Sequence, residues 1–200
     1  MWKSLALAFG LTANALVAQT LVDIRGLSRT WTDFGQIEGS CLSLDLDSGG
    51  VTIRPSEDRH VRVRYVGSRE QDLSRVRLRF DPSGDHPELR VSHTPNNGFE
   101  FEIQVPQTTG LDLRMSAGEL TIQGVEGDKD LRLHAGEITV RVGDPGAYGP
   151  VSASVWAGEV NPGPFGEEAK GGLFRSFRHD GQGRYSLRAK VKAGEVTFLK

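Results

Sequence analysis

The sequence lacks several features on which common classes of protein depend. Its 200 residues contain one cysteine, Cys41, so no disulfide can form within the chain. The formal net charge is only −2, which indicates neither nucleic acid nor an anionic membrane surface as a partner. Beyond the first residues, no apolar run approaches the roughly 20 residues that span a bilayer.

Recognisable catalytic motifs are also missing. The chain has no G-x-S-x-G, H-E-x-x-H, P-loop or dinucleotide fingerprint. Its histidines show no metal-ligand spacing; they are His60, His86, His93, His134 and His179. We therefore expect a protein that is not an enzyme and that needs no cofactor.

Cys41 has two interpretations. It lies far downstream of the N-terminal apolar run, which argues against a lipid anchor at this position. It is either a free reactive thiol or a small, half-buried residue at the start of a strand, and we favour the second.

What the sequence does contain is a repeat. Ala-Gly-Glu occurs four times in the same apolar setting, and a degenerate copy, Ser48-Gly49-Gly50, precedes them; the four copies are 117–119, 135–137, 157–159 and 193–195. An internal repeat of this kind predicts stacked structural units.

The apolar residues change phase at each copy. Leu131, Leu133 and Ala135 alternate with polar residues, and the alternation then resumes at Ile138, one position out of step. A bend at Gly136 would let both segments face one core, and glycine adopts the required positive φ at low cost.

The spacing of the copies favours one stacked turn per copy. Gly118 and Gly136 are 18 residues apart, Gly136 and Gly158 are 22 apart, and Gly158 and Gly194 are 36 apart. The last interval corresponds to two turns or to one turn with an insertion. We predict an all-β, single-domain β-solenoid of short strands with glycine corners.

The N-terminus has the pattern of a secretory signal peptide. Lys3 precedes an apolar run, and Ala-x-Ala-like sites would allow cleavage after Ala15 or Ala18. We expect residues 1–18 to be removed and the protein to be exported. Residues 19–40 are then a cap on the solenoid, residues 41–200 are the solenoid, and about 161–184 form a loop insertion.

Two sets of residues are candidates for function. The first is the column of corner glutamates: Glu119, Glu137, Glu159 and Glu195. We favour the interpretation that they stay solvated or pair with arginines such as Arg114, Arg132 and Arg141. The alternative is that they bridge a cation through their carboxylate oxygens. The second is a set of aromatic residues that either pack on the solenoid or form a partner surface: Trp156, Phe174 and Phe177. For Trp156 we expect a position under the 161–184 insertion.

The chain resembles the DUF4097 family, β-strand-repeat proteins of bacterial envelopes that are labelled as adhesins. The resemblance is carried by Leu46–Ile53, by Ile103-Gln-Val-Pro106 and by the small-Gly-acidic corners from Ser116 onward. It implies an exported or membrane-tethered β-solenoid and brings no catalytic residues with it.

These observations favour a non-catalytic envelope or cell-surface binding module, with an envelope protein or a glycan as partner. One alternative is a polysaccharide lyase-like enzyme on the same scaffold, using the glutamates with Arg141, or the group Arg175, Arg178 and His179. Another is a self-assembling scaffold, in which the final segment 193–199 is an open edge.

Overall fold

The structure is a computed structural model that describes residues 21–37, 41–95, 98–166 and 173–200. The predicted signal peptide, residues 1–18, lies outside the described residues, as do parts of the predicted cap and insertion. Among the described residues, no helix is long and apolar enough to cross a membrane.

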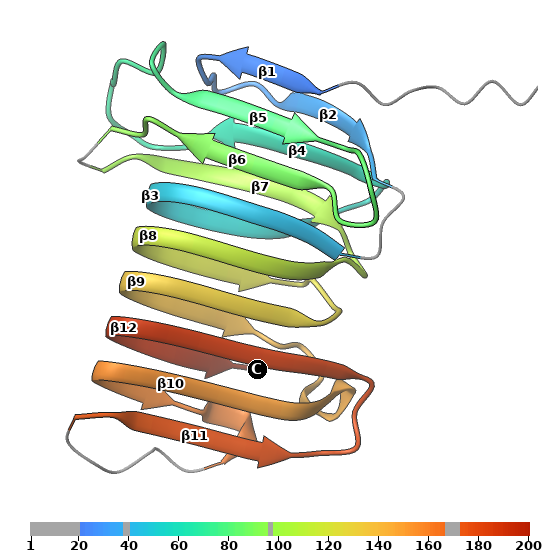
Figure 1. Ribbon diagram of the computed structural model, residues 1–200, viewed down its shortest axis with the longest axis vertical. Coiled ribbons are helices and arrows are strands. Elements are labelled where there is room, and N and C mark those ends of the chain that lie inside the picture. The colour runs from blue at the N-terminus through green and yellow to red at the C-terminus, as the bar shows by residue number, and fades with distance from the viewer. Residues whose placement is uncertain (1–20, 38–40, 96–97, 167–172) are drawn as a thin grey trace, which may run out of the picture.

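The described chain is all-β, as predicted, and its strands form one open sheet of 12 strands (Figure 1). The only helices are two short 3-10 turns, η1 at Pro145–Ala147 and η2 at Gly163–Phe165, within the part of the chain that the structure describes. The strands are β1 Val22–Arg25, β2 Thr32–Gln36, β3 Cys41–Ser56, β4 His60–Tyr65, β5 Arg77–Asp81, β6 Glu88–Ser92, β7 Glu100–Pro106, β8 Gly110–Gln123, β9 Lys129–Arg141, β10 Tyr148–Asn161, β11 Arg175–Asp180 and β12 Tyr185–Leu199.

Five long strands, β3, β8, β9, β10 and β12, bend in the middle and fold the sheet into two layers (Figure 1). Layer A contains their first arms together with β1, β5, β6 and β11, and layer B contains their second arms together with β2, β4 and β7. Alternate residues of both arms are buried, so the two layers enclose one core. The predicted change of phase is the bend between the layers.

The repeated glycines form the bends for two reasons. Gly118, Gly136, Gly158 and Gly194 all have φ between +121° and +139°, as the sequence indicated. They also stack so closely that a Cβ on Gly136 would lie 1.9 Å from the carbonyl oxygen of Gly118. The close approach of neighbouring backbones excludes every residue with a side chain.

The order of the bent strands differs from their order in the chain. They stack in parallel as β3, β8, β9, β12 and β10, so the C-terminal strand β12 lies between β9 and β10 (Figure 1). The alternative of a self-assembling scaffold took residues 193–199 as an open edge, and this is wrong because β12 is paired on both sides. Val196 pairs with Ile138 of β9 on one side and with Val160 of β10 on the other.

Antiparallel strands lie at both ends of the sheet, and at the β10 end they cover layer A but not the second arm of β10. At one end, the described residues of the predicted cap form β1 and β2, which pair with β5 and β4. At the other end, part of the segment predicted as a loop, 161–184, forms β11, which pairs with the first arm of β10. Between the degenerate corner at Gly49 and Pro106, alternating apolar and polar residues form β4, β5, β6 and β7.

Candidate functional site

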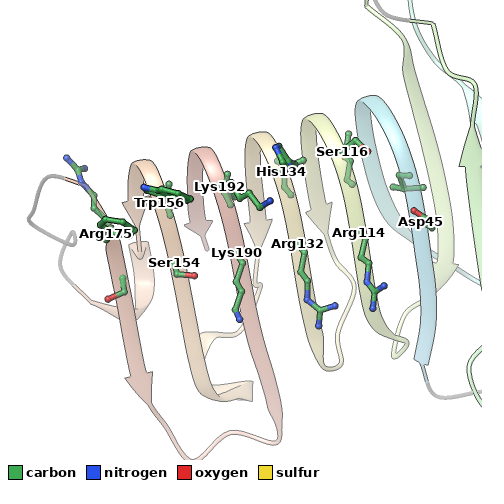
Figure 2. Close-up of a pocket in the computed structure, with 17 residues that line it drawn as sticks. Asp45, Arg114, Ser116, Arg132, His134, Ser154, Trp156, Arg175, Lys190 and Lys192 are labelled. Atoms are coloured by element: carbon green, nitrogen blue, oxygen red, sulfur yellow. The ribbon is translucent and has the colours of Figure 1, made fainter.

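The outer face of layer A carries two rows of side chains that cross the strands (Figure 2). Their positions follow from the alternation, because the residues two and four places before each corner glycine point away from the core. The first row joins residues in register on β3, β8, β9, β12 and β10: Asp45, Arg114, Arg132, Lys190 and Ser154. The second row, closer to the bends, contains Ser116, His134, Lys192 and Trp156.

Together with β11, these rows line a groove of about 690 Å³, which we call the basic groove. A second hollow of about 720 Å³ lies beside it over β12, β10 and β11. Ser154, Ser176 and Lys190 line both, so the two hollows are continuous. The result is an extended hollow surface that runs across six strands, from β3 to β11.

The electrostatics of the basic groove are one-sided. Among the described residues, Asp45 is the only carboxylate that lines it, and its Oδ2 lies 2.8 Å from Arg90 Nε. Arg132 pairs with Asp130 at 2.6 Å. Within the described ranges, Arg114, Lys190 and Lys192 have no ion pair, so their charges face solvent.

The cationic row costs stability on its own. Arg114, Arg132 and Lys190 occupy neighbouring strands in register, at an inter-strand spacing of about 4.8 Å. Like charges at such a distance repel by roughly 1 kcal/mol per pair in water-like surroundings. Asp130 compensates the charge of Arg132, whereas Arg114 and Lys190 have no ion pair among the described residues. Uncompensated charges of this kind are expected where they serve a ligand.

An exposed aromatic pair closes one end of the basic groove. The rings of Trp156 and Phe174 stack with their centroids 5.4 Å apart and their planes 16° apart. They are 57 % and 70 % exposed. We expected Trp156 to lie under the insertion; instead it lies in the open beside a residue of that segment.

The backbone of Phe174 is strained in this position. Its φ is 63°, in the left-handed region that costs a non-glycine residue roughly 1–2 kcal/mol. The Phe174 amide donates to the Trp156 carbonyl oxygen at 2.9 Å, which extends the pairing of β10 with the segment before β11. This hydrogen bond holds the exposed Phe174 ring next to Trp156 in spite of the backbone strain.

Phe177, the third aromatic candidate, lies elsewhere. It is half-buried and packs against the core, one of the two positions we had considered for it. Along β11, Arg178 is exposed and His179 is half-buried. Arg175 lines the basic groove and lies 3.4 Å from Glu159. His179 lies against Phe165, with ring centroids 5.7 Å apart. The group Arg175, Arg178 and His179 therefore does not converge on one point.

The corner glutamates are in register, as predicted, and lie on layer B. Their order along the sheet is Glu119, Glu137, Glu195 and Glu159. Thr197 donates to Glu195 at 2.6 Å, and Glu159 lies 3.4 Å from Arg175. Arg114 and Arg132, which we expected beside them, are on layer A instead. Among the described residues, no group of three or more acidic, histidine or cysteine side chains is arranged to hold a metal ion.

Two further titratable groups lie near the start of layer A. Cys41 is half-buried at the first residue of β3, as we favoured, and burial raises the pKa of its thiol. Lys129 is 2 % exposed, and burial lowers its pKa to about 8. The Lys129 ammonium donates to the Tyr148 hydroxyl at 2.6 Å and to the Gly127 carbonyl at 2.9 Å.

With this geometry established, comparison with known proteins gives one informative result. The fold resembles the crystal structure of a "putative cell adhesion protein" from Clostridium sporogenes, with a TM-score of 0.51 and 14 % sequence identity. The match covers 90 % of this chain and 98 % of that one. No family model matches the chain, and no curated protein does. At this identity, the likeness shows a shared fold.

Sequence reasoning missed the basic groove. For the residue three places before each repeat alanine, the sequence suggested only that Arg114 and Arg132 pair with the glutamates. That position reads Arg114, Arg132 and Lys190 in the three copies that prove to be neighbours. The repeating cation was a signal in the sequence. These cations form a continuous row only because β12 lies between β9 and β10, and this strand order could not be predicted from the sequence.

Proposed function

We propose that the protein is an exported, non-catalytic binding module of the bacterial envelope or cell surface, and that its binding site is the basic groove. The observation that carries the proposal is the exposed Trp156–Phe174 pair beside cations without ion pairs. Large exposed apolar groups on a soluble surface mark interaction sites, and aromatic and basic residues dominate binding energies.

The placement of these residues supports a binding role. The groove lies on paired strands, so the ligand-facing side chains are held on a rigid frame rather than on a loop. The name of the Clostridium sporogenes protein points to cell adhesion, and we extend that role to this chain. We further infer that the parallel bent strands are a short β-solenoid of the DUF4097 type.

The alternative function is a carbohydrate-active enzyme. Glycoside and polysaccharide chemistry uses converging acids and bases near the bound sugar. In the basic groove, Asp45 lies on β3, well away from Trp156 on β10, with β8, β9 and β12 between them, and it is paired with Arg90. This separation favours binding over catalysis.

Binding to envelope material tests the proposal. The full chain, expressed with its own N-terminus in a bacterial host, is purified from the exported fraction and mixed with isolated envelopes and intact cells. We expect saturable sedimentation with the envelopes, weakened about tenfold or more by Trp156→Ala, since exposed aromatic anchors contribute about 2 kcal/mol or more.

Val66→Ala is the matched control, because Val66 is also an exposed apolar residue, follows β4 and does not line the basic groove. We expect it to bind like the wild type. Absence of binding, or equal losses for Trp156→Ala and Val66→Ala, would contradict the proposal.

A further inference from the structure

The second hollow has a floor of small hydroxyl groups. Ser152 and Ser154 of β10 lie in register with Arg178 and Ser176 of β11 on one side. On the other side they lie in register with Arg188 and Lys190 of β12. Short serine side chains between long basic ones form a trough, and Asp180 is the one carboxylate among the described residues that lines it. Hydroxyls that both donate and accept hydrogen bonds line its floor.

The cations beside this trough form a ladder with the period of the sheet. Arg114, Arg132 and Lys190 follow one another at about 4.8 Å, the spacing of paired strands. In an extended polysaccharide, each sugar unit with its glycosidic oxygen advances the chain by about this spacing. An extended chain of acidic sugars laid across the strands can therefore place successive carboxylates near successive cations.

The aromatic pair supplies the third element. Trp156 and Phe174 present exposed ring surface in the basic groove, which is continuous with the trough through Ser154, Ser176 and Lys190. Aromatic faces pack against the apolar C–H face of a sugar ring, as amphipathic rings do at surfaces that are part apolar and part polar. Cations, hydroxyls and an aromatic face meet on one continuous surface.

We infer that this surface binds an acidic polysaccharide that runs across the strands of layer A. Lys190, Lys192 and Arg114 pair with its carboxylates, Ser152 and Ser154 contact its hydroxyls, and one sugar ring stacks on Trp156. A simple polyanion such as duplex DNA or an anionic vesicle would use the cations but has no need of the serine floor. The inference rests on the proposed function and names its ligand class.

The probe is polygalacturonate, with the uncharged polymer dextran, duplex DNA and phosphatidylglycerol vesicles as comparisons. We expect the exported protein to bind polygalacturonate, to ignore dextran, and to bind more weakly as salt is raised, because exposed charges are screened. The double variant Lys190→Gln/Lys192→Gln should weaken binding about tenfold or more, since charge-assisted hydrogen bonds contribute about 1.5 kcal/mol or more.

The matched control is Arg141→Gln/Lys200→Gln, which removes the same charge from the layer B end of β9 and from the residue after β12. It should bind like the wild type. Ser154→Leu, which fills the trough without changing charge, should also weaken binding about tenfold; melting curves confirm that each variant is folded.

Three results would overturn the inference: no binding of polygalacturonate, equal losses for the groove and control pairs, or tighter binding of DNA or vesicles through the same residues. Failure here is separate from failure of the proposed function. If envelopes still bind through Trp156 while polygalacturonate does not, the ligand class is wrong and the binding module stands.

Discussion

Each corner glycine lies so close to its neighbour that even the methyl group of alanine would not fit. In Gly136→Ala, the new Cβ would lie 1.9 Å from the Gly118 carbonyl oxygen, at a φ of +129° that alanine rarely adopts. We expect a loss of about 3–5 kcal/mol of unfolding free energy, combining backbone strain with overpacking. Urea unfolding followed by circular dichroism measures this loss.

Gly84→Ala separates the two contributions. Gly84 also has a positive φ, +78°, but no atom of the described residues would lie within 4 Å of a Cβ added there. It should lose only about 1–2 kcal/mol, the backbone part alone. Equal losses at both positions would mean that the corners do not stack closely.

Lys129 is the second residue with a measurable energetic consequence. Its pKa is lowered from 10.5 to about 8, because burial disfavours the ammonium. Below pH 8 the folded protein carries this buried charge. Between pH 8 and 10.5 the unfolded chain binds a proton that the folded chain has released, so the unfolding free energy rises with pH.

The expected rise is up to about 3 kcal/mol. Lys129→Met, which removes the titrating group, should not show it. The scan stays below about pH 10, because burial raises the pKa of Tyr148 and this tyrosine lowers stability at higher pH. A wild type whose unfolding free energy is as flat as that of Lys129→Met across this range would refute the assignment.

At the scale of elements, the insertion of β12 between β9 and β10 decides how the chain tolerates shortening. Removal of residues 185–200 takes away a strand that is paired on both sides, together with the core residues Val196 and Phe198, and exposes buried partners such as Ile138 and Val160. We expect the shortened chain to lose its cooperative thermal transition. Circular dichroism and near-ultraviolet spectra measure this directly.

Removal of residues 1–25 is the control. It takes away β1, an edge strand that pairs only with β5 among the described strands. A lower melting temperature with a retained cooperative transition is expected. If the chain without residues 185–200 melts cooperatively, β12 is not an internal strand.

The bends could be predicted from the sequence, but the strand order could not. The phase change around Gly136 requires a bend wherever the segment lies. The repeats, however, are so alike that the sequence does not determine which copies are neighbours. In the structure, the copy at Val191–Val196 pairs with both β9 and β10. The connections decide the order, and the antiparallel strand β11 within 161–184 turns the chain back toward β9.

At the scale of the whole molecule, a net charge of −2 conceals two different faces. Layer A presents the cations of the basic groove, whereas the outer side of layer B presents the glutamate column beside a row of threonines that includes Thr121, Thr139 and Thr197. Sequence order would place Trp156 beside His134. Trp156 lies beside Lys192 instead, because β12 is inserted between β9 and β10. The composition of the basic groove therefore depends on the strand order.

An envelope ligand is accessible only if the protein leaves the cytoplasm, and the predicted signal peptide makes this testable. Expressed in a bacterial host, the full chain should yield an exported product that begins at Leu16 or Gln19, as read by intact-mass spectrometry. Leu7→Arg places a charge in the apolar run and costs about 3 kcal/mol of membrane insertion, so export should stop. Thr20→Arg, beyond both cleavage sites, is the matched control and should be exported. A wild-type product that keeps Met1 in the cytoplasm would contradict export and remove the setting in which the basic groove meets an envelope polymer.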